Sequence, residues 1–172
     1  MKTINDLLIL RKPDNDDVEE LYLLKNDQET NDLLGGFSDG YSKEGIKEWI
    51  SFHNHADDEC LFLIQEIASS KVIGHVGFYK IDHRIRKAEF AIMIADKSAR
   101  GKGYGKMCTD FMLDFGFNQL NLNRIELSLL TTNIIAHKLY MKKGFIQEGL
   151  LKQAQFKNGN YIDVILMAKF KD

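Results

Sequence analysis

Apolar residues recur along the chain with two different spacings. Between residues 104 and 115 they fall on one face of a helix, at Tyr104, Met107, Cys108, Phe111, Met112 and Phe115. Residues 124–129 alternate between polar and apolar side chains, which is typical of a half-buried strand. Residues 88–95 are almost continuously apolar, so we expect a central strand that is covered on both faces.

Shorter patterns complete the expected order of elements. Further strands are predicted at residues 7–10, 61–64, 72–78, 145–151 and 161–170. Further helices are predicted at residues 18–22, 43–53 and 134–143. Gly35, Gly36 and Gly40 mark a loop, and Asn158 with Gly159 marks a turn between the last two strands. This order is typical of an α+β fold with a mixed sheet, and we expect one domain over residues 1–172.

Composition and charge narrow the possible partners. The 172 residues carry a formal net charge of −2, so we expect no general attraction to nucleic acid or to anionic membranes. No apolar run approaches the roughly 18 residues that a membrane span requires, and the N-terminus lacks the apolar core of a signal peptide. Cys60 and Cys108 show no metal or redox spacing. We therefore expect a cytoplasmic protein with reduced thiols.

A loop rich in glycine separates the apolar strand from the clearest helix. Its glycines stand at alternate positions, at Gly101, Gly103 and Gly105. Glycine permits positive φ and lets a ligand approach the main chain closely. The following helix directs its free N–H groups and the positive end of its dipole at the loop. Arg100, Lys102 and Lys106 add positive charge, so the segment is suited to bind phosphate.

Two well-known phosphate loops do not fit this segment. A Walker loop that ends at Gly105 and Lys106 needs glycine at position 100, where the chain has Arg100, and a hydroxyl residue at position 107. A dinucleotide fingerprint that starts at Gly101 needs its third glycine at position 106. The pattern that remains is Arg-x-x-Gly-x-Gly. On its own, it is also compatible with a plain glycine-rich turn between a strand and a helix.

A second motif follows downstream. Asn133, Ala136 and Tyr140 form the pattern Asn-x-x-Ala-x-x-x-Tyr, which is followed by Lys143-Gly144-Phe145. Ala136 and Tyr140 are four residues apart and share a helix face, and Asn133 stands at the expected helix start. Together with the glycine loop, this motif resembles the acyl-CoA site of the GNAT superfamily of N-acetyltransferases. The resemblance covers the chain from Leu8 to its C-terminus.

Other segments resemble particular subgroups of that superfamily. Glu148-Gly149 and residues 161–164 are similar to ribosomal-protein N-terminal acetyltransferases and to spermidine acetyltransferases. Residues 83–90 look most like the spermidine enzymes. Residues 35–60 match no pattern of the family, so the choice of acceptor stays open there.

The resemblance implies a fold and a donor site. The fold would be a single GNAT-like domain, with a mixed, mostly antiparallel sheet of about six to seven strands, about four helices and a splayed central strand pair. The donor would be acetyl-CoA, with its pyrophosphate on the glycine loop and its pantetheine arm on the splayed strand. By resemblance, the cofactor-binding residues are Ile92, Met93, Ile94, Arg100, Gly101, Lys102, Gly103, Tyr104, Gly105, Lys106, Asn133 and Ala136.

Two side chains are candidates for proton transfer. The resemblance makes Tyr140 the general acid that protonates the leaving thiolate, although a core tyrosine would fit the same position. Glu89 is the only ionisable residue in the apolar run 88–95, so it is our candidate for the base that accepts the amine proton through water. The alternative is a glutamate at the rim that pairs with Arg86 or Lys87. This chemistry requires no metal, and His53 and His55 do not share a helix face.

The acceptor is not determined by these motifs. We expect a primary amine, either of a polyamine such as spermidine or at a peptide N-terminus. An aminoglycoside or a nucleotide-linked amino sugar are alternatives, and so is a module that binds CoA without catalysis. Members of the family are often dimers or larger, so a homo-oligomer is also expected.

Overall fold

The computed structural model describes residues 1–35 and 38–171 and contains one eight-stranded sheet in that part of the chain. The order of strands across the sheet is β1-β2-β3-β4-β5-β6-β8-β7. All neighbours are antiparallel except β5 and β6, which are parallel. The strands are β1 (Lys2–Ile4), β2 (Leu8–Arg11), β3 (Cys60–Glu66), β4 (Val72–Asp82), β5 (Lys87–Ile94), β6 (Arg124–Leu130), β7 (Ile146–Lys157) and β8 (Asn160–Phe170).

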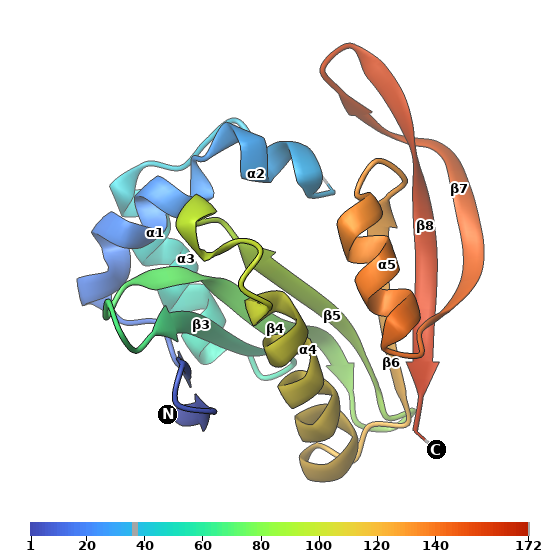
Figure 1. Cartoon of the computed structure of the whole chain (residues 1–172), viewed down its shortest axis with the longest axis horizontal. Helices are drawn as coiled ribbons and strands as arrows, with labels where there is room; N and C mark the ends of the chain where they lie inside the picture. The colour runs from blue at the N-terminus through green and yellow to red at the C-terminus, as the bar shows by residue number, and fades with distance from the viewer. Residues whose placement is uncertain (36–37, 172) are drawn as a thin grey trace.

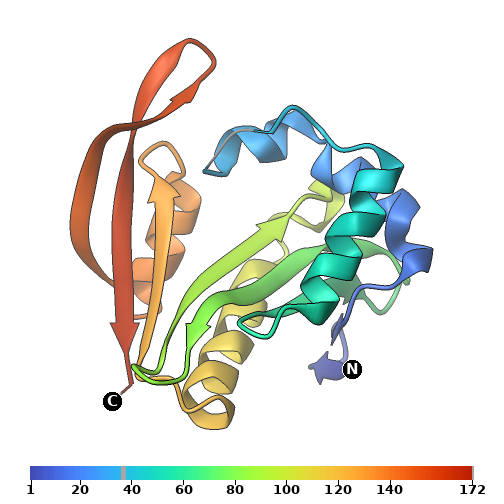
Figure 2. The same ribbon diagram turned by 180° about the vertical axis from the view of Figure 1, so that it is seen from behind.

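Helices cover both faces of this sheet. Figures 1 and 2 show α4 and α5 on one face, and α1 and α3 on the other. The short helix α2 lies above the open end of the sheet, between the strands of the N-terminal half and the long β7–β8 hairpin. The α-helices are α1 (Val18–Lys25), α2 (Gln28–Leu33), α3 (Lys43–His55), α4 (Tyr104–Asp114) and α5 (Ile134–Lys142). The α+β fold with a mixed, mostly antiparallel sheet is therefore confirmed, with eight strands in place of six to seven.

Two groups of buried side chains hold the helices against the sheet. The larger one lies under α4, which contributes Tyr104, Cys108 and Met112 from the face that the sequence pattern predicts. The smaller one joins α1 and α3 to the other face of the sheet through Leu21, Ile46 and neighbouring apolar residues. Burial of apolar side chains is the main force that holds such layers together.

The central strand β5 differs from its expected burial. It is not covered on both faces, because Ala91 is exposed while Ile92 and Ile94 are only half-buried. The reason is its pairing: β5 meets β6 only through Lys87–Glu89, opposite Arg124, Ile125 and Glu126. Its other edge pairs with β4 as far as Ile94. The two parallel strands therefore separate after Glu89, which confirms the expected splay.

Several elements extend or add to the sequence prediction. The short strand β1 and the helix α2 were not predicted, and β7 and β8 are longer than expected. Asn158 and Gly159 form the turn between β7 and β8, with φ of +50° and +79°. The loop predicted at Gly35, Gly36 and Gly40 is described except for Gly36, which lies outside the described residues. No helix in the described ranges has the length and apolar character needed to cross a membrane.

Candidate active site

The glycine loop joins β5 to α4 and presents main-chain atoms. Gly101 and Gly103 have φ of +77° and +79°, and a Cβ at either position would meet no atom within 4 Å. Gly103 is also the N-cap of α4, and no side chain caps this helix end. The first N–H groups of a helix lack partners within the helix, so this end is suited to bind an anion.

The basic side chains of the loop are already paired with carboxylates. Lys102 lies 3.0 Å from Glu66, and Lys106 lies 3.4 Å from Asp110. The pKa of Glu66 falls to about 2 because Ser69, Tyr104 and Lys102 donate hydrogen bonds to it. Both lysines are exposed, and such surface ion pairs are weak, so an anion on the loop can compete for the lysines as well as accept from the main-chain N–H groups.

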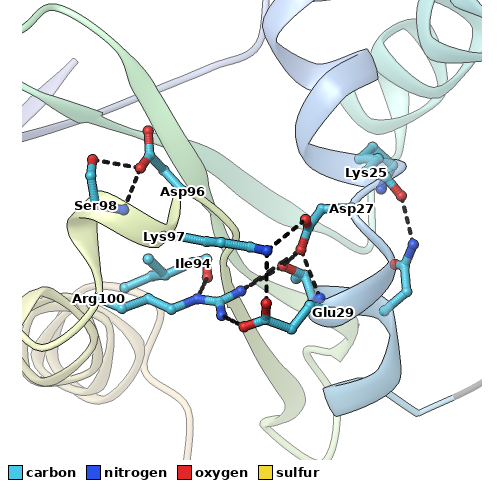
Figure 3. A network of polar contacts seen from close by, with 10 residues as sticks. Lys25, Asp27, Glu29, Ile94, Asp96, Lys97, Ser98 and Arg100 are labelled. Carbon is cyan, nitrogen blue, oxygen red and sulfur yellow. Dashed lines mark hydrogen bonds and ion pairs between the residues drawn. The ribbon is translucent and has the colours of Figure 1, made fainter.

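Arg100 reaches from the loop to Glu29 of α2 (Figure 3). Its guanidinium lies 2.5 Å from Glu29 and 2.8 Å from the hydroxyl of Thr30, and its Nε donates to the carbonyl of Ile94. Lys97 pairs with the same Glu29 at 2.7 Å. These contacts connect the loop directly to the short helix α2.

The splayed strand lies beside this loop. From residue 90 to residue 94, the edge of β5 that faces β6 has no strand partner, while Met93 is buried and Ile92 and Ile94 are half-buried. A Cβ on Gly105 would touch Ile94 of β5 and Leu139 of α5, at 3.6 and 3.9 Å. The start of α4 therefore lies between the two separated halves of the sheet.

Helix α5 supplies the second motif. The side-chain oxygen of Asn133 accepts from the N–H of Ala136 at 3.1 Å, and its amide group donates to the carbonyl of Leu33 at 3.2 Å. Asn133 thus begins α5, as expected, and also ties it to the end of α2. Ala136 is half-buried on the side of α5 that packs against the main core.

Tyr140 lies at the other end of α5, with only 7% of its surface exposed. Its ring packs at right angles to Phe90 of β5, with centroids 6.2 Å apart, and against Phe145 at 5.5 Å. Its hydroxyl has no hydrogen-bond partner among the described residues. Burial raises the pKa of Tyr140, so the phenol keeps its proton at neutral pH.

Glu89 stands where β5 and β6 separate. Its carboxylate lies 2.8 Å from the ammonium of Lys80, and its side chain is 35% exposed. The alternative prediction, that Glu89 pairs with Arg86 or Lys87, is wrong about the partner. The partner of Glu89 is Lys80, whereas Lys87 pairs with Glu126 at 2.8 Å. Successive side chains of a strand point to opposite faces, so Glu89 and Tyr140, which packs on Phe90, lie on different faces of β5.

Two hollows near α2 contain groups to which the sequence prediction assigned no role. A cavity of about 190 Å³ is lined by Lys25 and His75, and a groove of about 620 Å³ is lined by Asp32 and Asp163. Burial lowers the pKa of Lys25 to about 8. Lys25 follows Leu24 at the end of a helical pattern, where a lysine ordinarily faces solvent, so its burial gave no signal in the sequence.

Comparison with known proteins places this geometry in a family. The sequence model of the acetyltransferase (GNAT) domain matches residues 8–146. The spermidine N(1)-acetyltransferase of Vibrio cholerae is 33% identical over 97% of both chains. An uncharacterised N-acetyltransferase, p20 of Bacillus licheniformis, is 29% identical over 73% of this chain and 72% of its own.

Solved structures agree with these matches. The crystal structure of the Vibrio cholerae spermidine N-acetyltransferase in complex with CoA and spermine has a TM-score of 0.85 and 31% identity, over 96% of both chains. A dodecameric structure of that enzyme has a TM-score of 0.81 and 32% identity, over 96% of this chain and 95% of its own. The chain therefore belongs to the GNAT acetyltransferase family. It is an acyl-CoA-dependent N-acetyltransferase with acetyl-CoA as co-substrate, as the two motifs predicted.

Proposed function

We propose that the chain transfers the acetyl group of acetyl-CoA to a primary amine of a polyamine. The observation that carries this proposal is its similarity to a spermidine N-acetyltransferase along 97% of both chains. A groove lined by Asp32, Asp163 and Lys157 reaches Thr131, directly after β6. Asp163 already pairs with Lys152 at 2.8 Å, so Asp32 is the carboxylate of this groove that has no ion pair among the described residues. Carboxylates in a concave surface attract cations and raise their local concentration.

We propose that the donor binds along the splay. The pyrophosphate would lie on the main chain of residues 100–106, and the pantetheine arm would pair with the free edge of β5 at Ile92, Met93 and Ile94. The open space above Gly101 and Gly103 supports this arrangement. Asn133 and Ala136 would border the arm on the side of α5. In this arrangement Arg100 would hold α2 beside the donor through its bonds to Glu29 and Thr30, in addition to placing a positive charge near the pyrophosphate.

We propose that Glu89 and Tyr140 move the protons. An alkylamine with a pKa of about 10.4 is mostly protonated at neutral pH, so Glu89 would first accept a proton through water. The neutral nitrogen then attacks the thioester carbonyl carbon, and a main-chain N–H of β5 would stabilise the oxyanion. When the C–S bond breaks, the thiolate takes the proton of Tyr140. The tyrosinate regains a proton from the cationic nitrogen of the intermediate.

An acceptor screen tests this proposal. Purified protein, acetyl-CoA and one amine at a time are mixed, and the release of free thiol is followed. The panel contains spermidine, spermine, a peptide with a free N-terminus, an aminoglycoside and a nucleotide-linked amino sugar. We expect the highest kcat/KM for a polyamine. A preference for the peptide would replace the polyamine with a protein N-terminus as acceptor, and CoA binding without any transfer would indicate a non-catalytic module.

We also propose that the chain forms a homo-oligomer and is located in the cytoplasm. A dodecameric relative supports the first statement, and so does the outer strand β7, which exposes Ile146, Leu151 and Phe156. Long apolar edge strands are common sites of association. Cys60 and Cys108 are both free thiols, which agrees with a reducing compartment.

A further inference from the structure

The cavity beneath α2 is cationic. It has a volume of about 190 Å³ and lies between α1, α2, the central strands β4 and β5, and the end of β7. Its lining includes Lys25, Asn31, Tyr41, His75, Met93 and Lys157. Two of these residues are lysines, and no carboxylate is found among the described residues that line it. The neighbouring groove contains Asp32 and Asp163, and Lys157 lines both hollows.

Lys25 is buried in this cavity without a counter-charge. It is only 8% exposed, and its ammonium lies 4.8 Å from the ring of Tyr41 and 4.3 Å from that of Trp49. Among the described residues, the ammonium has no hydrogen bond or ion pair. Two aromatic faces stabilise a cation by about 0.5–2 kcal/mol each, whereas a buried charge without a partner costs several.

His75 adds a second polar group without a partner. Its Nδ1 atom is buried and has no hydrogen bond in the described part of the chain. Its pKa is lowered by burial first, and then by the charges of Lys25 and His53, so the ring is neutral and one of its nitrogens carries a proton. Within residues 1–35 and 38–171, Lys157 donates to the carbonyl of Asn31 alone, at 2.5 Å. Three nitrogen-bearing side chains therefore surround a space with no negative group.

We propose that this cavity binds an anionic group, either a phosphate or a carboxylate, which forms an ion pair with Lys25. The anion supplies the counter-charge that Lys25 lacks and accepts hydrogen bonds from the surrounding donors. The volume far exceeds the roughly 10–15 Å³ that one water molecule needs. Met93 lies in the part of β5 that no longer pairs with β6, where we place the transfer site, and it also lines the cavity. The anion would therefore bind next to the transfer site.

Titration with inorganic phosphate tests the site without any acetyl transfer, so failure here is distinct from failure of the proposed acceptor. The full chain is first saturated with CoA, because the proposed donor site on the glycine loop would also take up phosphate, and ionic strength is held constant during calorimetry. We expect saturable binding to the wild type and binding at least about tenfold weaker to Lys25→Met, since one charge-assisted hydrogen bond contributes that much. Lys25→Arg keeps the charge and should retain binding.

Lys47→Met is the matched control, because Lys47 is exposed on α3 and pairs with Glu44 at 3.0 Å. It should bind phosphate as the wild type does, and circular dichroism should show that all variants are folded. If the wild type shows no saturable binding, or if Lys25→Met binds phosphate as tightly as the wild type, the proposal is overturned.

The source of the anion is found by kinetics. If the anion belongs to the acceptor, Lys25→Met raises KM for amines that carry a phosphate or carboxylate and leaves KM for spermidine unchanged. If it is a separate small anion, added phosphate changes kcat/KM for spermidine in the wild type and has no effect in Lys25→Met. Either result places the anionic group at Lys25 and identifies where it comes from.

Discussion

Burial sets the protonation of single side chains in and beside the site. It raises the pKa of Tyr140 and lowers that of Lys25 to about 8, because in each case the charged form loses its contact with water. Tyr140 consequently stays neutral at physiological pH, as a proton donor must. Lys25 still carries its charge in most molecules at neutral pH, and a bound anion would raise its pKa back towards the ordinary value.

Tyr140→Phe tests the proposed acid. We expect kcat to fall by about 10²- to 10⁴-fold, the usual contribution of a general acid, while the affinity for CoA is unchanged. The fold should tolerate this change, since the phenol oxygen has no hydrogen bond in the described residues. Thiol release gives kcat and calorimetry gives the CoA affinity. Tyr22→Phe on α1 is the control, and an unaltered kcat in Tyr140→Phe would exclude the acid role.

Lys25→Met tests the cost of burying a charge. In phosphate-free buffer at pH 7, we expect the free energy of unfolding of the variant to exceed that of the wild type by up to about 3 kcal/mol. This is the cost of lowering the pKa of a lysine from about 10.4 to about 8. The charged form is disfavoured only in the fold. The cost is therefore complete below pH 8 and disappears as pH rises towards 10.4.

Urea unfolding between pH 7 and pH 10 measures this difference. The advantage of Lys25→Met over the wild type should shrink as pH increases, while Lys47→Met should show no such trend because Lys47 is exposed. A variant that is less stable than the wild type at pH 7 would mean that the contacts with Tyr41 and Trp49 outweigh the loss of hydration.

Residues that belong to a motif could be singled out from the sequence, whereas residues defined by tertiary burial could not. Tyr140 and the glycines stand at a fixed spacing, and their roles stay predictions. Tyr140 packs on Phe90 of β5, and Gly105 lies beside Ile94 of the same strand. Lys25 is largely buried because the fold brings Trp49 of α3 and Tyr41, which precedes α3, over its ammonium. The partner of Arg100 was equally inaccessible, since Glu29 is 71 residues away in sequence.

At the scale of elements, the start of α4 depends on main-chain geometry. Gly103→Ala tests it, with Gly159→Ala as a closely matched control: both glycines have φ of +79°, and in both a Cβ would meet no atom within 4 Å. Each variant should lose about 1–2 kcal/mol of unfolding free energy, because alanine disfavours positive φ. Only Gly103→Ala should bind CoA at least about tenfold more weakly, since its Cβ fills the space through which the pyrophosphate approaches.

Urea unfolding and calorimetric titration with CoA separate these two effects. Equal CoA affinity in Gly103→Ala and the wild type would remove the pyrophosphate from this loop. Equal weakening in both variants would instead indicate a general loss of structure, because Gly159 lies in the turn between β7 and β8.

Elements with a strong repeat were predictable, and short polar ones were not. The apolar face of α4 and the alternation in β6 match the structure because each packs against one core with one face. Helix α2 has six residues, of which only Thr30 is buried, so it has no apolar period to detect. Polar contacts from the glycine loop, from α5 and from β7 hold it instead. Such contacts exist only after the whole chain has folded.

At the scale of the whole molecule, the two outer edges of the sheet differ. One edge is the three-residue strand β1, whereas the other is the twelve-residue strand β7, which has β8 as its one strand partner in the described part of the chain. β7 exposes Ile146, Leu150, Leu151 and Phe156, with exposed fractions of 53%, 39%, 47% and 58%. These apolar side chains favour association because they would gain a partner. Lys152 and the two register shifts of β7 oppose pairing through the main chain, so we expect the contact to be made by side chains.

Light scattering after size exclusion tests this reading of β7. We expect the wild type to have a mass several times that of the 19.8 kDa chain, and Leu151→Lys to shift the population towards the monomer, because a lysine at a packed contact must lose its hydration. Leu23→Lys is the control, since Leu23 is exposed to a greater extent, 69%, but lies on α1, away from this edge. A monomeric wild type would separate this chain from its dodecameric relative. A change of mass in both variants would mean that the contact surface is not confined to β7.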